Sequence, residues 1–193
     1  MDNNEYKDRI TYPDYRSEND YLDCINFCLE RNFESMVITG TGEPLVNTRF
    51  LSWLSGILRG AERRFRWIDI QTSGVLLSGN TKLYNHLRDS LRVKTVSLSL
   101  SHFSNSHTNA DINGIPAQLQ FNIEDLCTEI LSYGFNLRLS LNLWKAYNDI
   151  DIADIILKAK KLGASQITFR KLYTSKTECP QNTWEPGQKQ YTL

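Results

Sequence analysis

A short loop, Gly40-Thr41-Gly42-Glu43, follows the apolar run 36–38 and carries residues suited to binding a ligand. Glycines let a backbone come close to a ligand and take up unusual dihedral angles. A carboxylate beside that backbone can bind a cationic amine. Two other interpretations of these four residues stay open: an ordinary strand-to-helix turn with an exposed Glu43, and a phosphate-binding loop. Phosphate favours amides without a facing carboxylate, so Glu43 counts against the last.

The loop belongs to a regular alternation of expected strands and helices. Short apolar segments predict strands, and apolar residues at helical spacing predict helices. The expected strands are 35–39, 66–74, 94–101, 136–144 and 165–173, and the expected helices are 19–32, 48–62, 80–91, 122–134 and 151–163. The second helix should begin at Asn47-Thr48, and Gly134 and Gly163 should end the last two. This order is typical of βα units, so we expect an α/β fold with a parallel sheet.

Polar and apolar residues alternate along the expected strands. The polar positions of two strands are Thr95, Ser97, Ser99 and Ser101, and Asn136, Arg138, Ser140 and Asn142. Because successive side chains point to opposite faces, one face of the sheet should be apolar and the other polar. A flat, half-covered sheet would give this pattern, and so would a sheet curled around a polar cavity. We expect the second, an open partial βα barrel, because the strands are too few to close an eight-stranded one.

Residues 38–47, ITGTGEPLVN, resemble the GGEPLL loop of the radical S-adenosylmethionine enzymes. The later segments are similar to the strands that follow it in that family: IDIQTSGVLL (68–77), VSLSLS (96–101), LRLSLNLWKAYND (137–149) and ITFRKLY (167–173). The resemblance covers residues 19–173. It implies a partial (β/α)6 TIM-like barrel that binds S-adenosylmethionine.

The resemblance also implies a role for each matching position. Glu43, with the backbone of Gly40, Thr41 and Gly42, would hold the methionine ammonium group. Either Ser97 or Ser99, and either Ser140 or Asn142, would reach the ribose hydroxyls or the carboxylate, and backbone near Leu172 would contact adenine. Arg138 lies deeper on the same polar face. One carboxylate and several short neutral hydrogen-bonding groups suit a zwitterion and a ribose.

The cysteines depart from the family pattern. The family's chemistry depends on a [4Fe–4S] cluster held by a C-x3-C-x2-C loop, and thiolates are the usual ligands of such clusters. Cys24 and Cys28 have the first spacing, but Arg31 stands where the third cysteine should be. We therefore interpret Cys24, Cys28 and Cys127 as helix residues in contact with the core, and no residue of this chain is expected to bind metal.

The absence of the C-x3-C-x2-C motif agrees with the number of strands, because the segments match only the second to sixth strands of the family. The first strand and its cluster loop have no counterpart, so we expect a fragment or a degenerate homologue. The cluster is expected only where the missing N-terminal segment is present. The expected division is a polar segment over 1–18, the barrel over 19–173 and an irregular tail over 174–193.

Composition limits the kinds of partner that this chain is expected to bind. The chain has 193 residues, with 22 Lys plus Arg and 22 Asp plus Glu, so no net field attracts nucleic acid or an anionic membrane. Its apolar runs are shorter than the ~20 residues that a membrane span needs, and no signal peptide is visible. We expect a cytoplasmic, single-domain protein whose partner is a small-molecule cofactor.

Three functions fit these observations. The first is a radical S-adenosylmethionine enzyme represented without its cluster segment, which in full-length form would generate a 5′-deoxyadenosyl radical. The second is a non-catalytic module that binds a nucleotide-like ligand or a protein on a barrel without a cluster. The third is an unrelated βα enzyme whose glycine loop holds a phosphate. A C-x3-C-x2-C motif encoded upstream of Met1 would support the first.

Overall fold

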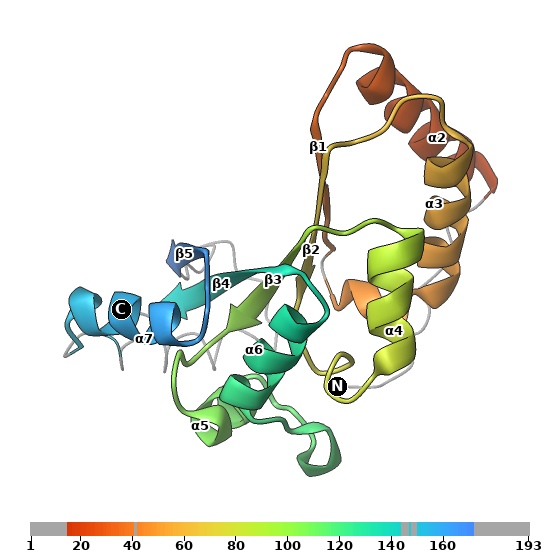
Figure 1. Ribbon diagram of the computed structural model, residues 1–193. Helices are drawn as coiled ribbons and strands as arrows, with labels where there is room; N and C mark the ends of the chain where they lie inside the picture. The colour runs from red at the N-terminus through yellow and green to blue at the C-terminus, as the bar shows by residue number, and fades with distance from the viewer. Residues whose placement is uncertain (1–14, 41, 144–146, 148–149, 172–193) are drawn as a thin grey trace, which may run out of the picture.

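The computed structural model describes residues 15–40, 42–143, 147 and 150–171, along which helices and strands alternate (Figure 1). The helices are α2 (Tyr15–Glu30), α3 (Thr48–Gly60), α4 (Thr81–Asn85), α5 (Ser106–Ile112), α6 (Ile123–Ser132) and α7 (Ile152–Lys161). The strands are β1 (Ser35–Ile38), β2 (Trp67–Thr72), β3 (Thr95–Leu100), β4 (Asn136–Leu143) and β5 (Gln166–Lys171). Three shorter turns are η1 (Pro44–Val46), the π-helical η2 (His86–Ser90) and η3 (Ala117–Leu119).

The five strands form one parallel sheet in the order β1-β2-β3-β4-β5. Each strand pairs with its neighbour in sequence, and a helix lies between each two strands. The predicted α/β class and the parallel sheet are therefore confirmed. The sheet is not closed, since β1 and β5 are its two edges within the described residues.

The two faces of the sheet differ as the alternation predicted. The pairing register places one set of side chains in rows across the strands, which we call the polar face. The polar face consists of Asp69, Gln71, Thr95, Ser97, Ser99, Arg138, Ser140, Asn142, Thr168 and Arg170. The opposite, apolar face contributes Ile38, Ile68, Ile70, Val96, Leu98, Leu100, Leu137, Leu139 and Leu141 to the buried core.

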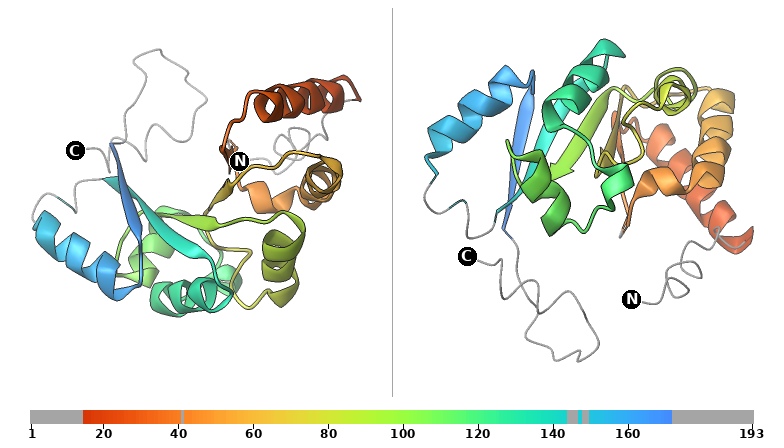
Figure 2. Two further views of the ribbon diagram at one scale, coloured as in Figure 1. Left: turned by 45° about the horizontal axis from the view of Figure 1, so that its top comes forward. Right: turned by 90° about the horizontal axis from the view of Figure 1, so that it is seen from below.

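Helices α4, α6 and α7 lie on the same side of the sheet (Figure 2). Their buried residues, among them Tyr84, Leu126 and Ile155, join the apolar face in a single core cluster. Helix α2 packs against α3 through Tyr21, whose ring centroid lies 5.5 Å from that of Phe50. Parallel sheets usually carry helices on both faces. In this sheet α4, α6 and α7 all lie on the apolar face, so none of these three helices covers the polar face.

Local hydrogen bonds explain where the helices begin and end. Asn47 caps α3 by accepting a hydrogen bond from the Phe50 amide at 3.0 Å, which confirms the predicted start. Asn122 caps α6 in the same way, with contacts to the amides of residues 124 and 125. Gly134 and Gly163 have positive φ and follow α6 and α7, as glycines after helix ends commonly do.

Some boundaries differ from the sequence-based expectation. Helix α2 begins at Tyr15, inside the segment 1–18 that was expected to precede the barrel. Residues 102–121, for which the sequence predicted neither helix nor strand, contain α5, which Asn105 caps through the Thr108 amide. The expected tail 174–193 lies outside the described residues. The helix expected over 80–91 is confirmed, but its second half is the π-helical turn η2.

Candidate functional site

The glycine loop leaves β1 at the carboxyl end of the sheet. A Cβ atom on Gly42 would meet no described atom within 4 Å, and one on Gly40 would meet only the Gly42 amide nitrogen at 3.9 Å. Neither glycine has a positive φ. Gly74 contrasts with both, because its φ is +86° and its Cβ would lie 2.6 Å from two leucine methyl groups. Packing therefore requires a glycine at 74, whereas Gly40 and Gly42 border open space.

The Glu43 carboxylate accepts four hydrogen bonds from the protein. Its Oε1 accepts from the Leu45 amide at 3.1 Å and from Thr72 Oγ1 at 2.8 Å. Its Oε2 accepts from the amide and the hydroxyl of Ser73, at 2.8 and 2.6 Å. The first of these bonds caps the turn η1, and the others join the end of β1 to the end of β2.

These contacts give Glu43 a structural role. A carboxylate offers about four acceptor positions, and the protein's own donors occupy that number. The side chain therefore contributes to the fold. A ligand ammonium group would have to replace one of the four donors, and the Ser73 hydroxyl is the most easily replaced because it can rotate to another acceptor.

An ion pair crosses the middle of the polar face. Arg138 on β4 contacts Asp69 on β2 with an Nη1–Oδ2 distance of 2.9 Å, although β3 lies between these strands. The side chains are 22% and 14% exposed. Arg138 also donates from Nε to Gln166 Oε1 at 2.6 Å. Contacts with side chains of β2 and β5 therefore engage this guanidinium group.

A second connection spans still more of the sheet. Arg170 on β5 donates from Nη2 to Gln71 Oε1 on β2 at 3.1 Å, and Thr39 donates to the same oxygen at 3.0 Å. Arg170 lies three strands away from Gln71 and four residues further along the strand direction. On a flat sheet the Cα atoms of the two residues would be about 19 Å apart. Their side chains meet because the sheet twists and bends toward its polar face, as Figure 2 shows.

Two serine hydroxyls lie buried between these connections. Ser97 is 1% exposed and Ser140 is 0% exposed, and neither Oγ atom has a hydrogen-bond partner among the described residues. A buried polar group without a partner costs free energy, so each is a position where a ligand or water would be favoured. Ser99 and Asn142, half-buried on the same face, lie one step nearer the carboxyl ends of β3 and β4.

The predicted site residues thus fall into two groups. Ser97, Ser99, Ser140 and Asn142 come together on adjacent strands of the polar face. Gly40, Gly42 and Glu43 lie at the carboxyl end of β1, with β2 between them and the serines. Thr41 and Leu172 lie outside the described residues.

Sequence reasoning missed four residues of this region: Asp69, Gln71, Thr72 and Ser73. Asp69 and Gln71 occupy the polar positions of the strand 66–74, so the alternation used for the other strands could have found them. Thr72 and Ser73 lie within residues 68–77, which are similar to a family strand. Their contact with Glu43 joins positions about 30 residues apart, so no local pattern shows it.

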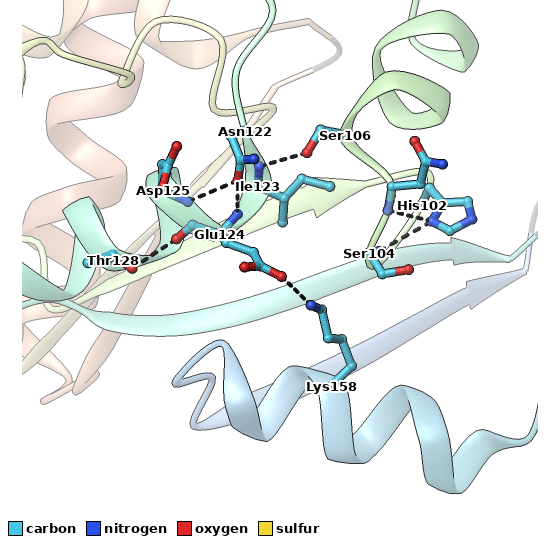
Figure 3. Close-up of polar contacts among 10 residues, drawn as sticks. His102, Ser104, Ser106, Asn122, Ile123, Glu124, Asp125, Thr128 and Lys158 are labelled. Atoms are coloured by element: carbon cyan, nitrogen blue, oxygen red, sulfur yellow. Dashed lines mark hydrogen bonds and ion pairs between the residues drawn. The ribbon is translucent and has the colours of Figure 1, made fainter.

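His102 follows β3 and has a defined tautomer (Figure 3). Its Nδ1 accepts hydrogen bonds from the amides of Ser104 and Asn105, at 3.2 and 3.0 Å, so the proton of the neutral ring is on Nε2. The ring stacks on Phe103, with centroids 5.4 Å apart. Burial lowers the pKa of His102 below its usual range. This histidine stabilises the turn that leads into α5.

The described cysteines do not form a cluster site. Cys24 and Cys28 lie in α2, exposed and half-buried, and Cys127 is buried in α6. Burial raises the pKa of the Cys127 thiol to about 12, which disfavours the thiolate that a metal ligand needs. Across the described part of the chain, no three His, Cys, Asp or Glu side chains lie close enough together to hold a metal ion.

Two cavities lie away from the polar face. One of about 320 Å³ borders the end of α2, and one of about 530 Å³ lies between η1, α3 and α4. The larger is lined by Leu45, Val46, Thr48, Leu51, Ser52, Leu76, Asn80, Lys82, Leu83 and His86. Neither lining contains a residue of the glycine loop or the polar face.

Comparison with protein-family models and with curated proteins found no match to this sequence. Among the described helices, none is long and apolar enough to cross a membrane.

Proposed function

We propose that this protein binds S-adenosylmethionine at the glycine loop and the adjoining polar face, as a protein of the radical S-adenosylmethionine type. The observation that carries the proposal is the open space beside Gly40 and Gly42 at the carboxyl end of β1. In open α/β sheets, ligands bind at the carboxyl ends of the strands. Two glycines that no neighbouring atom requires are well placed for close approach by a ligand.

The side chains present fit the cofactor. Glu43, with the backbone of Gly40, Thr41 and Gly42, would bind the ammonium group in exchange for the Ser73 hydroxyl. The hydroxyls of Ser97 and Ser140 lack partners, and the ribose hydroxyls and carboxylate of the cofactor can supply them. In the same proposal, Ser99 and Asn142 are alternative contacts, and backbone near Leu172 contacts adenine.

The bend of the sheet supports a partial barrel. The Arg170–Gln71 hydrogen bond closes a long diagonal over β3 and β4 on the polar face. A sheet that curls toward a polar interior and carries helices outside is the arrangement of a βα barrel. We propose that the five strands form most of an open (β/α)6 barrel around this ligand.

The iron–sulfur cluster of the family does not fit the described residues. Their cysteines are separated, and they offer no group of three metal ligands. One-electron chemistry would therefore depend on a cluster bound elsewhere, and we derive no reaction step from the residues seen here.

A nuclear magnetic resonance titration with S-adenosylmethionine tests the proposed binding. We expect the amide signals of Gly40, Gly42 and Ser73 to shift most, followed by those of the β3 and β4 ends. Signals of α7, on the opposite side of the sheet, should stay in place. An unchanged spectrum, or shifts confined to the cavity between α3 and α4, would refute this binding site.

A further inference from the structure

Arg170 is a cation without a carboxylate partner in the described part of the chain. It lies exposed on β5, and its one contact there is with the neutral amide oxygen of Gln71. The ion pairs of the described residues join Arg88, Arg138 and Lys158 to their acidic partners.

Gln71 holds this guanidinium group over the polar face. Its Oε1 accepts from both Thr39 and Arg170, which uses both acceptor positions of an amide oxygen. Because Arg170 is four residues further along its strand than the row of Gln71, the contact runs diagonally over β4 and β3. The charged group therefore reaches across the polar face, although the residue is exposed to solvent.

The carboxylates near Arg170 are already engaged. Asp69 is bound by Arg138, and the Glu43 carboxylate at the edge already accepts four hydrogen bonds. The buried hydroxyls of Ser97 and Ser140 have no partner among the described residues, and the Arg170 guanidinium has only an amide oxygen. A hydroxyl can donate as well as accept, so the two serines and the positively charged Arg170 can together donate hydrogen bonds to an oxyanion.

We propose that Arg170 binds the carboxylate or phosphate group of a small-molecule ligand held over the polar face. This inference rests on the proposed function for the identity of the site. An oxyanion can accept two parallel hydrogen bonds from a guanidinium group, and charge-assisted bonds are about twice as strong as bonds to a neutral amide. The ligand therefore displaces Gln71 from Arg170.

Two sources could supply the oxyanion: a separate anionic substrate, or the carboxylate of S-adenosylmethionine. Arg170→Met removes the charge from an exposed position and should leave the fold intact. Arg64→Met is the matched control, because it removes the same charge from an exposed residue between α3 and β2, away from the polar face.

The first experiment titrates the full chain with inorganic phosphate and follows the amide signals of the polar face. Arg170→Met should weaken phosphate binding by about tenfold or more, the usual effect of losing a charge-assisted hydrogen bond. Arg64→Met should change it by less than about twofold. Gln71→Glu gives Arg170 an internal carboxylate partner and should also weaken binding. Equal phosphate affinity in the wild type and Arg170→Met would overturn the proposal.

A second titration distinguishes the sources. It uses S-adenosylmethionine and 5′-deoxy-5′-(methylthio)adenosine, which lacks the carboxylate. If Arg170→Met weakens only the first, the oxyanion is the cofactor's own carboxylate. If it weakens phosphate binding and leaves both nucleosides unaffected, the oxyanion belongs to a separate substrate. If the wild type binds phosphate through Arg170 but not S-adenosylmethionine, the proposed function fails and the anion site stands.

Discussion

The Glu43 side chain connects the carboxyl ends of β1 and β2 through hydrogen bonds. Its four hydrogen bonds come from the turn after β1, from Thr72 at the end of β2 and from Ser73 just after it. Thr72 Oγ1 continues the network by accepting from the Gly74 amide at 3.0 Å. Gly74 in turn packs against Leu98 and Leu126 so closely that no side chain fits there. At the scale of the residue, the glycine loop and the core are linked through this one carboxylate.

Replacing Glu43 with glutamine should therefore reduce stability. The glutamine NH2 group cannot accept the hydrogen bonds that one carboxylate oxygen now receives, so two donors lose their acceptor. We expect Glu43→Gln to lower the free energy of unfolding by about 1–3 kcal/mol. Chemical denaturation of the wild type, Glu43→Gln and the exposed control Glu62→Gln measures this. Stability equal to that of the control would mean that the four hydrogen bonds contribute little.

His102 should make stability depend on pH. The unfolded histidine binds a proton near pH 6.5, whereas burial lowers its pKa in the folded protein. Protons then bind the unfolded chain more readily, so the stability present above pH 6.5 should be lost as pH falls below it. Denaturation at pH 7.5 and 5.5 should show a smaller loss for His102→Asn than for the wild type. His107→Asn is the control, and an identical loss in all three proteins would contradict this role.

At the scale of the element, side chains connect strands that are not hydrogen-bonded neighbours. The Asp69–Arg138 pair joins β2 to β4 over β3, and the Arg170–Gln71 contact joins β5 to β2. Both lie on the polar face, and the described helices α4, α6 and α7 lie on the other side of the sheet in Figure 2. These contacts replace part of the packing that a second layer of helices would provide, and they hold the bend of the sheet.

A double-mutant cycle measures the contribution of the first connection. Asp69→Asn and Arg138→Met should each destabilise the protein, and the double variant should lose less than the sum of the two. For a partly buried pair we expect a coupling energy of about 1–2 kcal/mol. Additive effects would show that the pair contributes nothing to holding β2 and β4 together.

The helices and strands that the sequence predicts well are those whose apolar residues recur at a regular spacing. Alternation in strands such as 136–143 identified the polar face correctly, because each apolar residue there must point into the core. Helix α5 was missed because its seven residues, SHTNADI, have little apolar periodicity and depend on the Asn105 cap. The contacts of Glu43 and Arg170 join residues about 30 and 99 positions apart, so no local pattern shows them.

At the scale of the whole molecule, the described chain has a layer of helices α4, α6 and α7 on the apolar face of the sheet, and none of these three helices lies on the polar face. All five strands of the sheet run parallel, so their carboxyl ends and the loops that follow them share one edge. The residue types at this edge could be predicted from the sequence. It could not show that the Glu43 carboxylate is already occupied, because that depends on where the turn after β2 folds.

Iron–sulfur reconstitution tests the molecule as a whole. The 193-residue chain, treated anaerobically with iron and sulfide, should show no stoichiometric [4Fe–4S] absorbance, since its described cysteines do not converge. Iron and sulfide analysis beside the visible spectrum would measure this. Four irons per chain in a stable cluster would show that the chain binds a cluster through residues other than those described.

The most direct measurement of the central claim is calorimetric titration of the chain with S-adenosylmethionine. The wild type should bind, and Gly42→Val should weaken binding by about tenfold or more, or ~1.4 kcal/mol per tenfold, because the added side chain fills the open space at the loop. Its melting temperature should stay unchanged. Gly56→Val, at an exposed position of α3 that also borders open space, should alter neither quantity. A wild type that does not bind, or equal binding by all three proteins, would contradict the proposed site.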